Sequence, residues 1–249
     1  MSDGFFVAVL DPGVRVGSRV TLDGPEGRHA AVVRRIGVGE TVTVTNGEGR
    51  GVRGPVVAVR KDGLDLEVAQ LLESVPSRPR VVCVQALPKN ERAEQAVDLL
   101  TEIGVDEIVP WQAARSIVRW SGERGEKALA KWQAVAREAA KQSRRLTVPV
   151  VAPLATTAQV AVRLGAAPAA YVLHEGATQR VETVRPPRSE VVVVVGPEGG
   201  IAPDELAAFE AAGATTVLIA DTVLRSVTAG AVAVAQLRLL ASLSEEIEA

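Results

Sequence analysis

A run of five valines at residues 191–195 leads directly into the turn sequence GPEGG at residues 196–200. Short β-branched runs bounded by glycine are typical of strands that are covered on both faces. Pro203 and the acids that follow it mark the start of a helix. The pattern therefore predicts a strand, a tight turn and a helix, with the turn at the carboxyl end of a buried strand, where open α/β sheets bind ligands. The turn matches neither the GxxxxGK[ST] nor the GxGxxG pattern, so both common phosphate-binding fingerprints are absent.

The composition limits the class of protein. Of 249 residues, 47% are hydrophobic and 3% are aromatic, so a core of aliphatic side chains is expected. No apolar run approaches the roughly 20 residues of a membrane helix, and the start of the chain lacks the basic segment of a signal peptide. Cys83 is the one cysteine, which excludes an internal disulfide or a cysteine-based zinc site and favours a reducing, cytoplasmic setting. We expect Cys83 to pack in the core.

The charge is unevenly distributed. The net charge is −2, but residues 111–150 hold nine Lys or Arg and only three Asp or Glu. Such a basic block is typical of a nucleic-acid footprint, and it is equally typical of a solvated helix face. Charge alone leaves these alternatives open.

Residues 1–72 have the pattern of an all-β unit. The alternating TVTVT at residues 41–45 precedes a turn at residues 46–49, and further strands are expected at residues 56–59 and 64–71. Only residues 27–35 have a helical pattern. His29 has no second ligand at a suitable spacing, so no metal site is predicted. The strands indicate a small barrel or sandwich.

Residues 73–80 form the expected linker, and strands alternate with helices from residue 81 onward. Expected strands cover residues 81–86, 107–109, 170–173, 191–195 and 216–219. Expected helices cover residues 91–103, with Asn90 as N-cap, and residues 122–145, 157–164, 203–212 and 226–243. Alternation of this kind predicts a largely parallel sheet with helices on its faces.

Three loops follow the carboxyl ends of strands in the last third of the chain. They are residues 174–176, 196–200 and 220–225. If their strands are neighbours, the loops converge on one crevice, and a ligand site is expected there.

These loops carry the motifs YVLHEGA at residues 171–177, VGPEGGIAPDE at residues 195–205 and VLRSVTA at residues 223–229. With them the chain resembles the RsmE-type methyltransferases of the SPOUT class, which methylate N3 of a uridine in bacterial 16S rRNA. The resemblance extends through QALPKNERAEQAVDLLTEIGVDEIVPW at residues 85–111, RSIVRW at residues 115–120, and HAAVVRRIGVGETVTVTNGEG at residues 29–49.

The resemblance implies an α+β two-domain fold. Residues 1–72 would be a PUA-like β-barrel that binds RNA, and residues 81–249 a SPOUT methyltransferase domain with a trefoil knot. It also implies S-adenosyl-L-methionine as cofactor, the small ribosomal subunit as partner, and a homodimer in which the terminal helix takes part. Neither a membrane nor a metal is implied.

The motif match carries roles to particular residues. The catalytic candidates are Arg225, Glu175 and Glu198, with Arg225 stabilising charge on the uracil carbonyls and a carboxylate taking the N3 proton. The cofactor-binding candidates are Leu173, His174, Gly196, Glu198, Gly199, Gly200, Ile201, Ile219, Ala220, Leu224, Arg225, Ser226, Thr228 and Ala229. The RNA-binding candidates are Arg35, Lys89, Arg115, Arg119, Lys141, Arg144 and Arg145.

Departures from the family pattern keep alternatives open. Val227 stands where the family has an acid, and Ala220, Thr222 and Glu175 also differ from the usual residues. A ribose 2′-O-methyltransferase of the same class, or a non-catalytic RNA-binding or assembly factor, therefore remains an alternative to a uracil-N3 enzyme.

Overall fold

The computed structural model describes residues 4–89 and 92–248, and the side chains up to residue 243. The chain divides into two compact units, which are described separately. Unit 1 comprises Met1–Val75 and Ala140–Val148, and unit 2 comprises Pro76–Ala139 and Pro149–Ala249. The segment 140–148, which the sequence pattern groups with the second part of the chain, belongs to unit 1.

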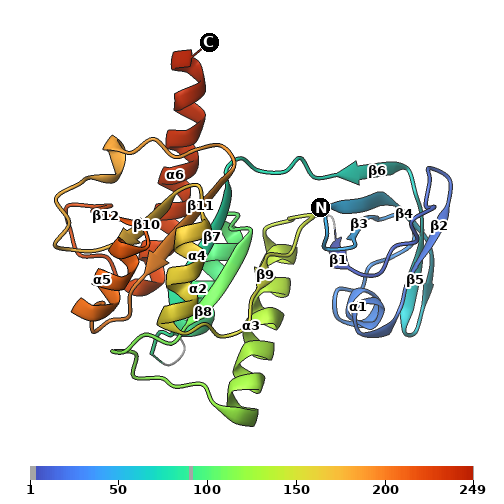
Figure 1. The fold of residues 1–249 in the computed structure, drawn as a ribbon. Coiled ribbons are helices and arrows are strands. Elements are labelled where there is room, and N and C mark those ends of the chain that lie inside the picture. Colours follow the sequence, from blue (N-terminus) through green and yellow to red (C-terminus); the bar gives the residue numbers. More distant parts are fainter. Residues whose placement is uncertain (1–3, 90–91, 249) are drawn as a thin grey trace. The chain divides into compact units, whose positions relative to one another are not determined.

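Unit 1 is built on a six-stranded, largely antiparallel sheet in the order β1-β3-β4-β5-β2, with β6 also paired to β4 (Figure 1). Its strands are β1 (Gly4–Val7), β2 (Arg19–Leu22), β3 (Thr41–Thr45), β4 (Arg50–Arg60), β5 (Gly63–Glu67) and β6 (Gln70–Glu73). Strand β1 runs parallel to β3, and the hairpin expected after residue 45 joins β3 to β4.

The core of unit 1 is aliphatic, as the composition predicts. Leu22, Val42, Val44 and Leu64 are fully buried in it. The expected helical segment is present as α1 (Gly24–Arg28), which continues as the π-helical turn η1 (His29–Val33). The run expected at residues 64–71 is divided into β5 and β6, and both strands pair with β4.

Unit 2 contains a second six-stranded sheet, in which every pairing is parallel, in the order β12-β10-β11-β7-β8-β9. Its strands are β7 (Arg80–Ala86), β8 (Glu107–Trp111), β9 (Val150–Val151), β10 (Ala170–Leu173), β11 (Glu190–Val195) and β12 (Thr215–Val217). The helices are α2 (Arg92–Glu102), α3 (Gly122–Gln142), α4 (Thr157–Ala166), α5 (Pro203–Ala211) and α6 (Ser226–Glu248), with the short turn η2 (Val181–Thr183). The last three residues of α3 belong to unit 1.

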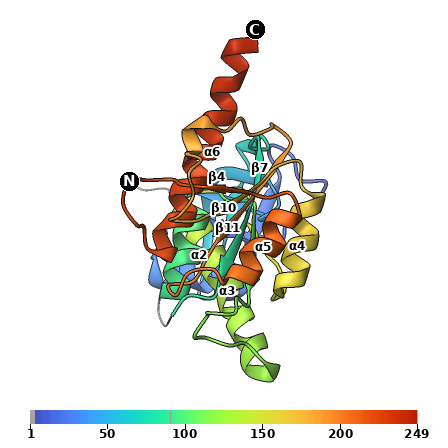
Figure 2. The same cartoon turned by 60° about the vertical axis from the view of Figure 1, so that its left-hand side comes forward.

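Helices cover both faces of this sheet (Figure 2). Alternate residues of β7 and β11, such as Val82 and Val192, pack on one side with Val160 and Leu164 of α4 and Phe209 of α5. Helices α2 and α6 cover the opposite face. The valine run of β11 is therefore buried on both sides, which is why it shows no alternation.

Close packing fixes α6 on the sheet. A Cβ atom added at Gly230 would lie 3.1 Å from Leu100 of α2, and 3.4 Å from Cys83 of β7 and from Val195 of β11. Burial raises the pKa of the Cys83 thiol to about 12, which agrees with a packing role for this residue.

Helix α6 is also the one helix in the described residues that is long and apolar enough to cross a membrane. The window Ser226–Leu243 has a mean hydropathy of 1.5, and 44% of it is buried. A buried core helix meets the same criterion, and at Gly230 helix α6 packs closely against α2, β7 and β11.

Several boundaries differ from the sequence pattern for local reasons. Helix α3 ends at Gln142 because Arg144 has a φ of 55°, a left-handed conformation that cannot continue the helix. Strand β12 ends at Val217 because Leu218 bonds instead to Gln179 and Val181. The expected N-cap Asn90 and the first expected helical residue, Glu91, lie outside the described residues.

Candidate functional site

The three loops predicted to converge do so. Strands β12, β10 and β11 are neighbours, and the loops at their carboxyl ends line a pocket of about 610 Å³ in unit 2. A pocket that binds a small organic molecule has a volume of about 300–1,000 Å³, so this one has the size of a ligand site. Its position at the ends of neighbouring parallel strands follows the general rule for open α/β sheets.

The GPEGG turn forms one wall, and its glycines allow neighbouring residues to approach closely. A Cβ atom at Gly196 would lie 2.8 Å from Ile201, and one at Gly199 would lie 3.3 Å from Arg115. Gly200 has a φ of 73°, which side chains other than glycine rarely adopt. These three positions leave backbone groups, rather than side chains, to face the pocket.

The loop after β10 contributes His174 and Glu175. The His174 Nδ1 atom accepts a hydrogen bond of 3.0 Å from the Gly176 backbone N–H. This bond leaves Nε2 as the protonated nitrogen of the neutral ring, so His174 is a hydrogen-bond donor at this site. Glu175 is exposed at the pocket, and in the part of the chain that the structure describes its carboxylate has no hydrogen bond or ion pair.

The loop between β12 and α6 supplies the third wall. Asp221 on this loop accepts a 2.7 Å hydrogen bond from Arg180, which also pairs with Glu182. The two acids raise the pKa of the Arg180 guanidinium by hydrogen bonding. Together with the bonds from Leu218 to residues 179 and 181, this pair joins the loop to the segment that follows β10.

Arg225 ends this loop and precedes helix α6. Its carbonyl accepts bonds from the backbone N–H groups of Thr228 and Ala229, while its exposed guanidinium has no partner among the described residues. A cation at a helix N-terminus is electrostatically unfavourable because the helix dipole is positive there. An unpaired arginine in this position therefore favours interaction with a negatively charged ligand over a structural role.

Glu198, the acid of the GPEGG turn, also lines the pocket. Its Oε1 accepts a 3.3 Å hydrogen bond from the backbone N–H of Lys89. The carboxylate thus connects the GPEGG turn to the loop after β7, which is the structural alternative to a catalytic role.

The buried carboxylate of Glu205 holds together the segments that form this part of the pocket wall. Glu205 of α5 is 6% exposed, and its Oε1 accepts hydrogen bonds of 2.8 Å from both the Ala114 backbone N–H and the Thr157 hydroxyl. Its Oε2 accepts one of 3.2 Å from the backbone N–H of Ala202. Glu205 therefore ties the loop that carries Arg115 to the starts of α4 and α5.

The pocket contains nearly all the residues predicted for cofactor and catalysis. Arg225, Glu175 and Glu198 line it, and so does every cofactor candidate except Thr228. The Thr228 hydroxyl instead donates to the Arg225 carbonyl at 3.1 Å, in the first turn of α6. Val227, which stands at the position of the family's acid, is 3% exposed and does not line the pocket.

The predicted RNA-binding residues are more scattered. The prediction is wrong for Lys141. Its side chain is 8% exposed and pairs with Glu26 at 2.9 Å, so it is not available to phosphates. Arg115 lines the pocket and donates to the Gly199 carbonyl at 3.2 Å. Arg119 donates to the carbonyls of Ala113 and Ala114.

The remaining candidates lie in both units. In unit 1, Arg35 and Arg144 are exposed, and Arg145 donates to the Thr147 hydroxyl at 3.4 Å. Lys89 is exposed in unit 2, in the loop after β7.

Sequence reasoning missed other lining residues. Pro197, Asp221, Thr222 and Val223 lie within or beside the predicted loops, so extending the site over each whole loop would have found them. Glu205 carries only the signal of an acid in a first helical turn, and that signal predicts a helix start and no contact with Ala114. No cluster of three or more His, Cys, Asp or Glu residues is placed to hold a metal ion in residues 4–89 and 92–248.

The comparisons with known proteins agree with this geometry. Residues 76–238 match the model of the RNA methyltransferase domain family. The ribosomal RNA small subunit methyltransferase E of Mycobacterium bovis is 45% identical over 231 residues, which are 91% of this chain and 88% of the relative. The enzyme of the same name from Bacillus subtilis is 25% identical over 90% of this chain and 91% of its own length.

A solved structure has the same fold. The small subunit methyltransferase E of Neisseria gonorrhoeae, bound to S-adenosyl methionine, superposes with a TM-score of 0.84 at 25% identity, covering 96% of this chain and 98% of that one. Fold and site thus define an RNA methyltransferase. Within that class, the chain belongs to the ribosomal RNA small subunit methyltransferase E family.

Proposed function

We propose that this protein transfers a methyl group from S-adenosylmethionine to N3 of a uridine in 16S rRNA of the small ribosomal subunit. The observation that carries the proposal is the convergence of three loops on one pocket in a chain that belongs to this methyltransferase family. Because its substrate is ribosomal, we place the protein in the cytoplasm.

The pocket fits the cofactor. Its volume of about 610 Å³ suits an adenosyl group with its amino-acid tail, and the small residues of the GPEGG turn leave backbone groups to hold it. Gly196, Ile219 and Leu224 would hold the adenosyl part through their backbones. When bound, S-adenosylmethionine supplies an electrophilic methyl group on its sulfonium.

The residues of this chain must then accept one proton and stabilise one developing negative charge. Uracil N3 carries a proton that has to leave before the nitrogen can attack, and negative charge spreads to the O2 and O4 carbonyls as it does so. Arg225, unpaired at the pocket, is the group that would stabilise this charge. Glu175 would take the proton, because its carboxylate is exposed at the pocket and Glu198 already accepts from Lys89.

We expect Glu175→Gln to lower single-turnover methyl transfer about 10²- to 10⁴-fold, the usual contribution of a positioned base. The matched control is Glu198→Gln, which keeps an acceptor for the Lys89 N–H and should retain more activity. If Glu198→Gln were the more damaging change, the roles of the two acids would be reversed.

The reaction itself is tested with small ribosomal subunits from a strain that lacks the gene. Incubation with the protein and labelled S-adenosylmethionine, followed by nucleoside mass spectrometry, should yield N3-methyluridine. A 2′-O-methylated product would replace the proposal with ribose methylation, and the absence of any product on subunits and on free 16S rRNA would favour a non-catalytic factor.

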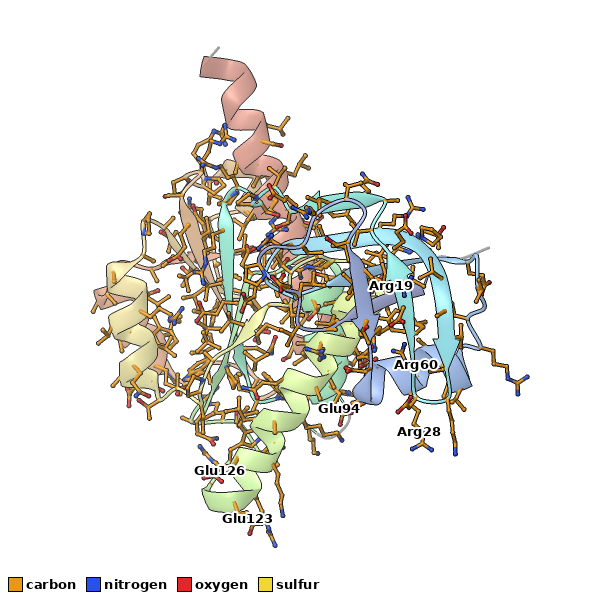
Figure 3. All side chains as sticks on the ribbon, turned by 90° about the vertical axis from the view of Figure 1, so that its right-hand side faces the viewer. Arg19, Arg28, Arg60, Glu94, Glu123 and Glu126 are labelled. Atoms are coloured by element: carbon orange, nitrogen blue, oxygen red, sulfur yellow. The ribbon has the colours of Figure 1, made fainter. Side chains whose placement is uncertain are left out.

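We further propose that unit 1 is the PUA-like RNA-binding domain that the resemblance implies. Exposed arginines support this assignment. Figure 3 shows Arg19 and Arg28 on β2 and α1 of this unit, and Arg35 and Arg144 are also exposed, whereas Arg60 of β4 is paired with Asp65. Cations of this kind contact phosphates and give binding that depends on salt.

The double variant Arg35→Ala and Arg144→Ala should weaken binding to small subunits and lower the slope of log affinity against log salt by about 1 for each lost phosphate contact. Both residues already have positive φ, so alanine adds no new type of backbone strain. Affinity for S-adenosylmethionine, measured by calorimetry, should stay unchanged. Lys61→Ala, an exposed cation on the β4–β5 turn, is the control, and an equal loss there would remove these two arginines from the RNA site.

The proposal includes a homodimer and a knotted SPOUT topology. Exposed apolar side chains on α6 support the dimer, since Leu239 is 58% and Leu243 is 45% exposed. The bonds that join Leu218 to Gln179 and Val181 support close association of two chain segments beside the pocket. Sedimentation equilibrium would measure the dimer, and a monomer at micromolar concentration would contradict it.

A further inference from the structure

A second, smaller cavity of about 160 Å³ lies in unit 2, between the loop after β7 and the start of α3. Its walls are mainly apolar and aromatic, with Leu87, Pro88, Val118, Trp120 and Trp132 among them. Trp132 is buried and Trp120 is half-buried, and their rings meet edge to face with centroids 5.1 Å apart. An aromatic side chain that is only partly covered has surface left for a planar ligand.

The cavity wall is held in place by hydrogen bonds. The Gln112 side chain accepts from the Trp120 backbone N–H at 3.1 Å and donates to the Val118 carbonyl at 3.1 Å. The Arg119 guanidinium folds back onto the carbonyls of Ala113 and Ala114. This loop is therefore ordered before any ligand arrives, which lowers the entropy that binding would cost.

Two loops connect this cavity to the methyltransferase pocket. Residues 113–121 place Arg115 in the first pocket and Trp120 in the second. The loop after β7 places Leu87 in the second cavity, while the backbone N–H of Lys89 bonds to Glu198 in the first. The two cavities are thus neighbouring parts of one surface.

The volume of the second cavity and the charged residues that line it limit the class of ligand that it can bind. A volume of about 160 Å³ is well below the roughly 300–1,000 Å³ of sites that hold a complete small molecule, and it suits a single planar ring. Lys131 of α3 and Glu94 of α2 both line the cavity and form an exposed ion pair, and Figure 3 labels Glu94. Exposed pairs of this kind contribute little stability, so the ammonium and the carboxylate can each turn to a ligand as donor and acceptor.

The surrounding charge favours a polyanion as the source of that ring. Within unit 2, residues 111–139 hold six cations and three acids, and Arg115 and Arg119 lie on the connecting loop itself. Single-stranded RNA is recognised by stacking of its unpaired bases on aromatic side chains, with cations along the backbone.

We infer that this second cavity binds an unpaired base of the RNA substrate, adjacent in the strand to the uridine that enters the first pocket, by stacking on Trp120. The inference rests on the proposed function for the identity of the first base. Trp120 would then be a specificity-determining residue that helps to hold the strand open after the target base leaves its stack.

The test compares Trp120→Ala with Trp120→Phe in equilibrium binding to unmethylated small ribosomal subunits. Loss of one stacked base should weaken binding about 5- to 100-fold for Trp120→Ala, and Trp120→Phe should recover most of it. Affinity for S-adenosylmethionine should be unchanged in both variants, and both should stay folded at the assay temperature, although Trp120→Ala loses the edge-to-face contact with Trp132. Trp120→p-benzoylphenylalanine should crosslink to 16S rRNA at a nucleotide close to the methylated one.

Because binding and crosslinking require no catalysis, they separate this inference from the proposed function. A crosslink to RNA without methylation would keep the RNA-base site and overturn the reaction. Unchanged RNA affinity in Trp120→Ala would overturn the site. An equal loss of RNA affinity in both variants, together with a lowered unfolding midpoint, would also overturn it, because the role of Trp120 would then be packing. A change in sedimentation without a change in RNA affinity would assign the cavity to a protein side chain instead.

Discussion

Replacing Arg225 by alanine is expected to lower the rate of methyl transfer about 10²- to 10³-fold at saturating cofactor and RNA, the usual cost of losing one donor to developing negative charge. The measurement is single-turnover transfer from labelled S-adenosylmethionine to small ribosomal subunits. Arg225→Lys should be intermediate, because lysine keeps the charge and loses the planar pair of donors.

The physical reason lies in where Arg225 is placed. Its guanidinium is unpaired at the pocket, next to the positive end of α6, so two sources of positive potential act in the same direction. In the uridine ground state the carbonyls carry little charge, and they become more negative as the N3 proton leaves. The interaction is therefore stronger in the transition state than in the ground state, which is the condition for a rate effect.

Two other outcomes would change the role of Arg225. If the variant lost affinity for S-adenosylmethionine by the same factor as its rate, Arg225 would be a cofactor-binding residue. If the rate at saturation were unchanged and only the RNA concentration that gives half of this rate rose, the guanidinium would bind a phosphate. Calorimetry with the cofactor and a titration of subunits distinguish these results.

The order of the secondary structure in unit 2 could be predicted well because its elements have local signals. The valine run, the GPEGG turn and Pro203 mark the segment from β11 to α5, and the structure has these elements within one or two residues. Short elements held by distant partners were missed. Strand β9 has only two residues and exists through its pairing with β8.

The candidate site could be predicted because its three loops follow strands that are neighbours in a parallel sheet. Periodicity indicates each strand but cannot place β10 between β12 and β11. The sequence therefore predicts that the three loops converge only if their strands are neighbours, and the sheet order shows that they are. The position of Val227 was equally hidden. The sequence pattern puts it beside Arg225 and Ser226, whereas the turn of α6 directs it away from the pocket into the core.

Buried polar contacts between distant segments were beyond sequence reasoning. Lys141 has the pattern of an exposed helix cation, yet it pairs with Glu26, which is 115 residues away in the chain. Glu205 likewise has the pattern of a surface acid at a helix start. Its three acceptor contacts depend on how the loop after β8 and the start of α4 are brought to it, and no local signal encodes that arrangement.

Glu205→Ala is expected to destabilise unit 2 by about 3–5 kcal/mol, since it removes the buried carboxylate that accepts three part-buried hydrogen bonds, from Ala114, Thr157 and Ala202. The Thr157 hydroxyl also accepts from the Trp111 indole at 3.2 Å, so the loss extends to the core around Phe209, against which Trp111 packs. Chemical denaturation measures the free energy of unfolding.

The effect should reach the methyltransferase pocket because Ala114 directly precedes Arg115, which lines it. Once the Ala114 N–H is released, Arg115 loses the fixed backbone from which it bonds to Gly199, and the GPEGG wall loses its neighbour. We therefore expect weaker binding of S-adenosylmethionine at temperatures where the variant is still folded.

Glu205→Gln should lose less stability and less cofactor affinity. Its amide oxygen can still accept from Ala114 and Thr157, while its nitrogen cannot accept from Ala202. Glu210→Ala, an exposed acid on the same helix, is the matched control, and a comparable loss there would mean that the helix charge, rather than the buried contacts, stabilises this wall.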